Sequence, residues 1–269
     1  MDRALLVGIN KYPTAPLNGC VNDIVDMAGF LVDKLSFGND NIRLLVNERA
    51  TTDAIIERLG WLLTGVQSGD RVLFYYSGHG VQLPTRNPQG EVDGLDEAIC
   101  PVDFDWTDQH AIRDKDFHRI FSAVPAGVEF VWVSDSCHSA DLSREFLLPE
   151  IKIKTIIPPA DIQWRINTAI SKKVSTMGFK NAAESLNVAL VSGCKSDQTS
   201  ADATFNARAN GALSYFLLLE LKKAQGLSKP LNKIVENVNN TLRQQRYEQQ
   251  PQIEGSMFVQ NRSFLQSGS

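Results

Sequence analysis

The sequence predicts an α/β protein with a mostly parallel six-stranded sheet and helices on both faces of the sheet. Short apolar runs alternate with longer segments in which apolar residues recur every three or four positions, as a parallel sheet with crossover helices requires. The chain has 269 residues, 43% of them hydrophobic, and can bury a substantial core. We expect a single domain over residues 1–264 and a disordered polar tail at 265–269.

Each predicted strand is a short apolar run with turn residues or a helical pattern around it. The runs are residues 4–9, 42–46, 72–76, 131–133, 188–191 and 252–255. We expect the last and shortest of these to form an edge strand.

Each predicted helix carries apolar residues at helical spacing. The helices are expected from Asn22 to the turn at 38–40, after a Thr51 cap, after Asp114, from Gly211 to Leu221, and from Leu231 to Leu242. Threonine is a good helix cap because its hydroxyl accepts a hydrogen bond from a free backbone N–H in the first turn.

Residues 141–186 break this alternation. The segment contains Pro158 and Pro159 and little apolar periodicity, so we expect a long surface excursion rather than core. Its basic residues after Glu150 are Lys152, Lys154, Arg165, Lys172, Lys173 and Lys180.

Two of the predicted strands run into turns that carry an imidazole and a thiol. His79 follows the strand at 72–76, and Cys137 follows the strand at 131–133. Open parallel sheets bind ligands just beyond the carboxyl ends of their strands. A thiol is mostly protonated at neutral pH, so Cys137 needs a base such as His79 to become a nucleophile, and His79 can then protonate the leaving amine. We expect a Cys137–His79 dyad, with the amides of Gly80 and Cys137 as oxyanion donors.

Each of these residues alone has a plainer interpretation. Cys137 would be a buried thiol at a strand end, and His79 a turn histidine satisfied by the backbone. Their joint occurrence favours the dyad. His138 is a rival base, but a residue adjacent to Cys137 in an extended turn points away from it, so we expect His138 to have a surface or scaffolding role.

Five segments in order make the chain resemble a metacaspase, or the related prokaryotic orthocaspase, among the caspase-like cysteine peptidases. They are residues 17–23, 76–80, 93–97 with 101–103, 135–139 and 191–194. A histidine roughly 50 residues before the cysteine is also the caspase order. Ala140 departs from the glycine usual in the family. The resemblance implies a caspase-like fold, a cysteine endopeptidase, and cleavage during activation within 141–186; an insertion that is never cleaved is the alternative.

Two acidic residues lie near the predicted dyad. Asp135 is two residues before Cys137 on the same strand and therefore shares its face. The resemblance places Asp135 and Asp23 in the primary specificity pocket, lined also by Cys20 and Ser77. Two carboxylates would bind a guanidinium or an ammonium group, so we expect cleavage after Arg or Lys. Asp23 can also stabilise the first helix, because a carboxylate near a helix N-terminus interacts favourably with the helix dipole. This role is compatible with the one in the pocket.

The segment from Glu91 to Asp116 is dense in acidic residues, which suits Ca²⁺, although the spacing is not that of an EF-hand. The resemblance implies Ca²⁺ ligands at Asp96, Asp114, Asp116 and Asp141. Lys115 stands where a further family carboxylate is usual. A solvated acidic loop is the alternative, and we expect no organic cofactor.

Net charge and cysteine content argue against several other classes of protein. The formal net charge of −4 argues against a general binder of nucleic acid or of an anionic membrane. The four cysteines form neither a disulfide framework nor the close pairs of a zinc site. The first apolar run is too short for a signal peptide. We expect a cytoplasmic monomer that acts on proteins or peptides.

Two other functions remain open. A scaffold protein could keep the fold without turnover, although the intact dyad argues against it. A non-peptidase thiol hydrolase or acyltransferase could use a similar sheet. The acidic pocket argues against this third class, because a small acyl substrate offers it no cation.

Overall fold

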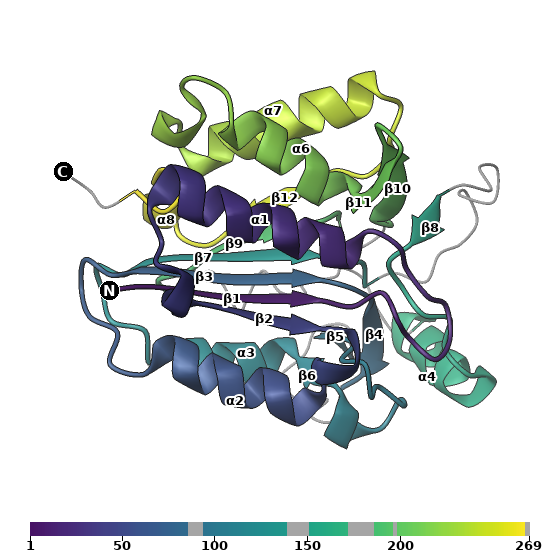
Figure 1. Cartoon of the computed structure of the whole chain (residues 1–269). Coiled ribbons are helices and arrows are strands. Elements are labelled where there is room, and N and C mark those ends of the chain that lie inside the picture. Colours follow the sequence, from purple (N-terminus) through teal and green to yellow (C-terminus); the bar gives the residue numbers. More distant parts are fainter. Residues whose placement is uncertain (86–93, 139–150, 172–185, 196–197, 267–269) are drawn as a thin grey trace.

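The computed structural model describes residues 1–85, 94–138, 151–171, 186–195 and 198–266. Its centre is a six-stranded sheet in the order β12-β9-β7-β3-β1-β2 (Figure 1). The strands are β1 (Asp2–Gly8), β2 (Ile42–Val46), β3 (Arg71–Ser77), β7 (Glu129–Asp135), β9 (Ala189–Ser192) and β12 (Gln252–Glu254). Only the short edge strand β12 pairs antiparallel within this sheet. The predicted fold class is confirmed.

Helices cover both faces of this sheet (Figure 1). One layer contains α1 (Cys20–Leu35), α6 (Ala212–Leu221) and α7 (Leu231–Gln244), and the opposite layer contains α2 (Thr52–Leu63) and α3 (Asp114–Phe121). Successive side chains of a strand point to opposite faces. Accordingly, Leu5 and Val7 of β1 enter one buried apolar cluster, and Ala4 and Leu6 enter the other.

Two smaller three-stranded sheets were not predicted. One consists of β4 (Gly80–Pro84), β5 (Leu95–Ile99) and β6 (Ile112–Arg113); the other consists of β8 (Lys152–Ile153), β10 (Ala201–Phe205) and β11 (Arg208–Gly211). Both lie near the end of the central sheet toward which β1, β2, β3 and β7 point (Figure 1). They therefore surround the end at which a parallel sheet binds its ligands.

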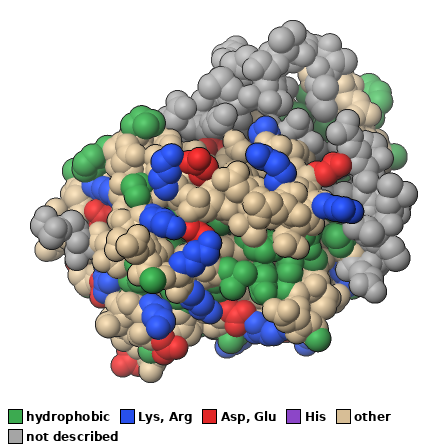
Figure 2. Space-filling view, turned by 90° about the horizontal axis from the view of Figure 1, so that it is seen from above, with side chains coloured by type: hydrophobic (Ala, Val, Ile, Leu, Met, Phe, Trp, Pro, Cys, Tyr) green, Lys and Arg blue, Asp and Glu red, His purple; other side chains and the backbone are tan. Residues whose placement is uncertain are grey.

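The remaining elements are short or peripheral. They are α4 (Ala160–Ser171), α8 (Met257–Gln260) and the 3₁₀ helices η1 (Asn39–Asn41), η2 (Asn47–Arg49), η3 (Asp108–His110) and η4 (Gly226–Ser228). None of the helices in the described ranges is long and apolar enough to cross a membrane. On the face above α6 and α7, Lys and Arg side chains are interspersed with Asp and Glu (Figure 2).

Helix boundaries differ slightly from the predictions. The first helix begins at Cys20 rather than Asn22, and it ends at Leu35, where Ser36 adopts a left-handed conformation with φ of 58°. The predicted cap at Thr51 is confirmed, since its side chain accepts a hydrogen bond from the Ala54 amide.

The prediction that residues 141–186 are surface rather than core is wrong for one stretch. Lys154 is fully buried, and Ile156 belongs to an apolar core cluster. The apolar residues around Lys154 carry the chain into the molecule as β8, which a search for helical periodicity does not detect. Residues 139–150 and 172–185 lie outside the described residues, as do 267–269 of the predicted tail. The tail prediction is wrong for Leu265, which is fully buried in an apolar cluster.

Candidate active site

The two turns predicted to carry the dyad lie side by side. Strands β3 and β7 are parallel neighbours, with Ser77 of β3 in register with Asp135 of β7. Each strand then continues by two residues, to His79 and Cys137 respectively, and both of these side chains are fully buried. The parallel pairing therefore brings the imidazole and the thiol to one edge of the sheet.

The His79 ring is oriented by a backbone carbonyl. Its Nε2 lies 2.7 Å from the carbonyl oxygen of Ala15, so Nε2 carries the hydrogen and donates it. In this tautomer Nδ1 is the free acceptor, and it has no hydrogen-bond partner in the described part of the chain. Burial lowers the pKa of His79 to about 4, although the Ala15 and Lys154 carbonyls favour its charged form. The site thus holds a neutral base with a free lone pair.

Tyr12 fixes the backbone around His79. Its hydroxyl accepts a hydrogen bond from the His79 amide over 3.0 Å and donates to the Cys100 carbonyl over 2.9 Å. The Tyr12 and His79 rings also contact each other, with centroids 4.4 Å apart. Tyr12 therefore holds His79 through both its backbone amide and its imidazole ring.

The Cys137 thiol lies among polar groups that the sequence did not point to. The backbone amide of Ser200 donates to the Cys137 sulfur, and the Cys194 sulfur lies 3.5 Å from it. Within the described ranges no hydrogen bond joins the Cys137 sulfur to the His79 ring. Catalytic hydrogen bonds are often absent or long before a productive complex forms.

The two predicted oxyanion donors converge on one oxygen atom. The Gly80 amide donates to the Lys154 carbonyl oxygen over 3.0 Å, and the Cys137 amide donates to the same oxygen over 3.2 Å. Two backbone donors aimed at a carbonyl can stabilise the negative charge that develops when a nucleophile attacks its carbon.

The predicted specificity pocket contains the side chain of the same lysine. Lys154 Nζ lies 3.0 Å from Asp135 Oδ2, 3.4 Å from Asp23 Oδ2 and 2.9 Å from Ser77 Oγ. Lys154, Asp23, Asp135 and Ser77 are all fully buried. The fourth predicted pocket residue, Cys20, is buried beside Ser77. The structure thus brings together the four residues that the resemblance assigned to the pocket, around an ammonium group.

The charges in this pocket stabilise one another. Burial alone would lower the pKa of Lys154, but Asp135 and other acidic groups around it hold that pKa well above its ordinary value. Burial raises the pKa of Asp23, while the Lys154 ammonium opposes this rise. Charges removed from water are tolerated only when they are paired and hydrogen-bonded. In this pocket the two buried carboxylates are thus balanced by the ammonium group of Lys154.

Sequence reasoning missed the residues that orient the two carboxylates. Asn210 Nδ2 and the Gly211 amide each donate to Asp23 Oδ1 over 2.9 Å. Ser200 Oγ donates to Asp135 Oδ1 over 2.8 Å, and the Ser214 amide donates to Oδ2 over 3.1 Å. These groups come from the residue just before β10, from β11 and from the start of α6, and the β10–β11 hairpin was not predicted.

Gly211 is required by close packing in this pocket. A Cβ atom at this position would collide with the Asp135 carboxylate and with Lys154 Nζ. The sequence marked Gly211 as a helix start, but the contact that requires a glycine comes from strands distant in the chain.

The expectation of a surface role for His138 is wrong, whereas a scaffolding role agrees with its position. Its side chain is only 7% exposed, and its Nε2 lies 4.0 Å from Glu97 Oε2. Burial lowers the pKa of His138. The residue packs beneath β4, where a Cβ on Gly80 would press against its ring.

The three predicted Ca²⁺ ligands that the structure describes, Asp96, Asp114 and Asp116, do not form a cation site as they lie. Asp96 binds Arg113 Nη1 over 2.7 Å through one oxygen and Lys115 Nζ over 2.8 Å through the other. Asp116 accepts a hydrogen bond from the Arg113 amide at the start of α3, which also includes Asp114. Asp141 lies outside the described residues. In the ranges that the structure describes, no group of three acidic, histidine or cysteine side chains could hold a metal ion.

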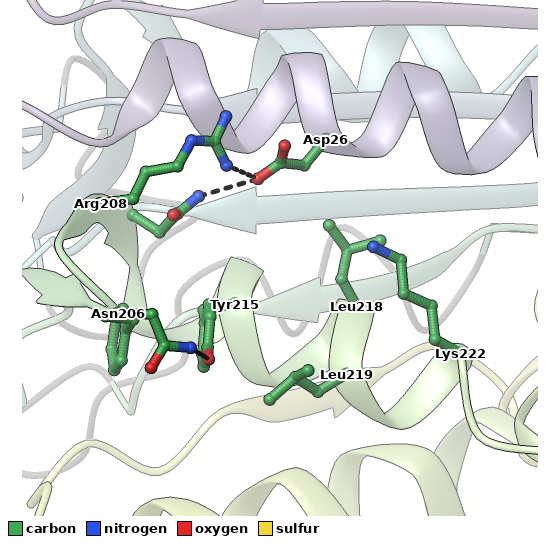
Figure 3. A pocket seen from close by; sticks show the side chains of 9 residues that line it. Asp26, Asn206, Arg208, Tyr215, Leu218, Leu219 and Lys222 are labelled. Carbon is green, nitrogen blue, oxygen red and sulfur yellow. Dashed lines mark hydrogen bonds and ion pairs between the residues drawn. The ribbon is translucent and has the colours of Figure 1, made fainter.

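A separate surface pocket of about 240 Å³ is lined by residues of α1, of the β10–β11 hairpin and of α6 (Figure 3). Its lining includes Asp26 of α1, which pairs with Arg208 and accepts a hydrogen bond from Asn210, and Tyr215 and Leu219 of α6. Asn210 therefore bridges this pocket and the Asp23 carboxylate. Among the described residues, the lining of the surface pocket contains no cysteine, serine, threonine or histidine.

Comparison with known proteins places the whole chain in one family. The profile of the caspase domain family matches residues 1–261. The chain is 31% identical to Metacaspase-1 of Meyerozyma guilliermondii over 94% of its own length and 69% of the relative's. It is 33% identical to Metacaspase-1 of Schizosaccharomyces pombe, over 79% of this chain and 58% of the relative. The crystal structure of a protein from Geobacter sulfurreducens superimposes with a TM-score of 0.71 at 24% identity, and the match covers 100% of this chain and 99% of that protein's chain. This likeness supports the fold.

Proposed function

This chain belongs to the caspase domain family, and we propose that it is a cysteine endopeptidase that cleaves proteins after Lys or Arg. Cys137 is the proposed nucleophile and His79 the proposed base. The chain spans only part of the length of its metacaspase relatives, 58% for the relative from Schizosaccharomyces pombe, so their activity is carried over here as a proposal.

The proposed chemistry follows from the orientation of each group. His79 Nδ1, the free acceptor of its ring, takes the thiol proton, and the Cys137 sulfur attacks the carbonyl carbon of the substrate. The oxygen then carries negative charge and is stabilised by the amides of Gly80 and Cys137. His79 gives its proton to the leaving amine. Water hydrolyses the thioester and restores the thiol.

The observation that carries the specificity is the Lys154 ammonium bound between Asp23 and Asp135. A basic residue placed before the scissile bond gains the same charge-assisted contacts. An acidic residue there would add a third carboxylate to two that are already buried. An apolar residue would leave both carboxylates without a cation, which is costly in a buried site.

The same groups favour a peptidase over the two other functions considered. A scaffold without turnover has no need for two amides aimed at one carbonyl oxygen beside a thiol. A thiol hydrolase acting on small acyl groups has no use for a buried site that binds an ammonium. A cytoplasmic location and a monomeric state stay predictions.

Calcium activation also stays a prediction, based on the resemblance. In the described arrangement Asp96 is already neutralised by Arg113 and Lys115, so a cation would first have to displace the Lys115 ammonium. No step of the proposed mechanism passes through a metal ion.

A panel of fluorogenic peptides tests the function. The peptides carry Arg, Lys, Asp or Ala before the scissile bond and are otherwise identical. We expect cleavage of the Arg and Lys peptides only, and none by the Cys137→Ala variant. Cleavage after Asp alone would refute the proposed specificity, and activity that survives Cys137→Ala would refute the nucleophile.

A further inference from the structure

Cys194 is a buried thiol that takes no part in the proposed mechanism. It follows β9, the parallel neighbour of the nucleophile strand β7. The two chains stay together at the ends of these strands, because the Gly193 amide donates to the Ser134 carbonyl over 2.9 Å. In the sheet, β7 lies between β9 and β3. Cys137 is therefore flanked by the strand that positions His79 and by the strand that positions Cys194.

The sulfur atoms of Cys137 and Cys194 lie 3.5 Å apart. A disulfide has an S–S length of about 2.05 Å, so the two atoms need to approach by roughly 1.5 Å to form one. The backbones that carry them are in close contact, since a Cβ on Gly193 would lie 3.1 Å from the Ser136 carbonyl oxygen. Both cysteines are free thiols. They are therefore placed to be joined by a disulfide.

The surroundings of these two thiols differ from those of the other two cysteines. Cys20 and Cys100 belong to one of the apolar clusters of the described residues, whereas Cys137 and Cys194 belong to neither. The Cys194 sulfur lies 3.2 Å from the Gln198 carbonyl oxygen. A cysteine that only fills space behaves as a small apolar residue and packs among apolar groups. Cys194 lies instead in a polar site beside the nucleophile.

The groups around the two sulfurs give them different roles. The Ser200 amide donates a hydrogen bond to the Cys137 sulfur, and His79 is the base that takes the proton from it. The hydrogen bond to Cys137, together with burial, holds the pKa of Cys194 well above its ordinary value, so Cys194 stays a protonated thiol. Oxidants react with thiolates rather than with thiols. Cys137 is therefore the sulfur that is oxidised first.

We propose that Cys137 and Cys194 form a reversible disulfide when a peroxide enters the active site. The Cys137 thiolate attacks one peroxide oxygen; an S–O bond forms, the O–O bond breaks and hydroxide leaves, which gives a sulfenic acid. The Cys194 sulfur then attacks the Cys137 sulfur. An S–S bond forms, the S–O bond breaks, and the leaving hydroxide takes the Cys194 proton and becomes water. Two thiols and one hydrogen peroxide thus give one disulfide and two waters.

The disulfide protects the nucleophile from irreversible damage. A sulfenic acid with no thiol beside it is oxidised further to a sulfinic acid, which thiol reductants do not restore, whereas a disulfide is reduced to two thiols. Once Cys137 is oxidised it is no longer a thiolate, so the hydrogen bond that kept the proton on Cys194 is lost. The expected loss of peptidase activity rests on the proposed function, but the formation of the disulfide does not.

The test treats the full chain with hydrogen peroxide in the absence of substrate. Activity is measured with a fluorogenic Lys peptide before treatment, after treatment and after reduction with dithiothreitol. Peptide maps prepared without reductant identify the state of each cysteine by mass spectrometry. Wild type is expected to lose its activity, to contain a cross-linked peptide pair with Cys137 and Cys194, and to regain most of its activity on reduction.

Two variants complete the design. Cys194→Ser keeps the size of the side chain but cannot form a disulfide. Reduction should restore several-fold less of its activity than in wild type, and its map should show a sulfinic acid on Cys137. Cys100→Ala is the matched control, because it removes a buried cysteine that lies in an apolar cluster. It should form the same cross-link and recover as wild type does, relative to its own starting activity.

The outcomes separate this inference from the proposed function. The inference is overturned if Cys137 of wild type stays unmodified or becomes a sulfinic acid without a cross-link, or if Cys194→Ser recovers as fully as wild type. The wild-type map decides alone if Cys194→Ser fails to fold. A wild type that cleaves the Lys peptide but forms no cross-link keeps the function and refutes the disulfide. One that forms the cross-link but cleaves no basic peptide does the reverse.

Discussion

The ammonium of Lys154 lies 3.0 Å from the Asp135 carboxylate, and neither side chain is exposed. A buried ion pair contributes little net stability compared with apolar residues of the same size, yet loss of one partner is strongly destabilising. A functional role therefore explains the buried Lys154–Asp135 pair better than a contribution to the stability of the fold does. Under the proposed function, with the two donor amides and the thiol beside the pair, that role is recognition of a basic residue at the point of cleavage.

Replacing Asp135 with Asn should weaken cleavage of Lys and Arg peptides. The substrate cation would lose a charge-assisted contact in a buried site, at a cost on the order of 2 to 5 kcal/mol in kcat/KM. Asp26→Asn is the matched control, because Asp26 lies on α1 beyond the pocket and pairs with Arg208. Steady-state kinetics of both variants check this prediction. An Asp135→Asn enzyme with wild-type kcat/KM for Lys peptides would contradict it.

The dyad should behave as one unit. Cys137→Ala and His79→Ala should each abolish turnover, and the double variant should be little worse than either single one, because each change removes the same step. Rates are measured with an Arg peptide, and circular dichroism checks that the fold is kept. Additive losses would mean that the two residues act separately.

Stability should fall in mild acid because of His79. Burial places the pKa of His79 at about 4 in the folded chain, below the value of 6.5 for a free imidazole. Between these values the unfolded chain binds the proton and the folded chain does not, so this contribution is complete above pH 6.5 and is lost as the pH falls toward 4. The full loss is about 3 kcal/mol.

Thermal unfolding from pH 7 to pH 4.5 measures this effect. His79→Gln should show a shallower fall of Tm than wild type. His138, whose pKa is also lowered by burial, contributes to the slope of both proteins and cancels in the comparison. Equal slopes would show that folding does not lower the pKa of His79.

Calcium should raise activity weakly in wild type and more strongly in Lys115→Asp. The change removes the ammonium that now binds Asp96 and supplies another carboxylate. Mg²⁺ should substitute poorly, because it keeps its waters and demands octahedral geometry. Peptidase assays against free Ca²⁺ check this prediction. Full activity of both proteins in excess chelator, unchanged by Ca²⁺, would make the acidic segment a solvated loop.

The sequence was enough to predict the central sheet and the turns at its ligand-binding end. Apolar runs such as residues 72–76 are short, buried and bounded by glycine, so their strands could be placed without knowing their partners. The positions of His79 and Cys137 at one edge follow from parallel pairing alone.

The hairpin and the internal strand could not be predicted in the same way. Strands β8, β10 and β11 contain few residues each and gain their pairing from each other across the chain, so local periodicity says little about them. Lys154 appeared only as one basic residue in an irregular segment. A signal was present, since Lys154 stands in the run from Ile151 to Ile157, where β-branched residues favour a strand.

Labelling of the nucleophile tests the central claim most directly. Lys154→Gln, whose pocket is open, is incubated with peptidyl chloromethyl ketones that carry Lys or Asp at the reactive position, and the modified cysteine is identified by mass spectrometry. The account predicts that the Lys reagent alkylates Cys137, that the Asp reagent leaves it free, and that the added Asp135→Asn change slows the Lys reaction at least tenfold. Preferred alkylation by the Asp reagent, or attachment of the Lys reagent to Cys20, Cys100 or Cys194 instead, would contradict it.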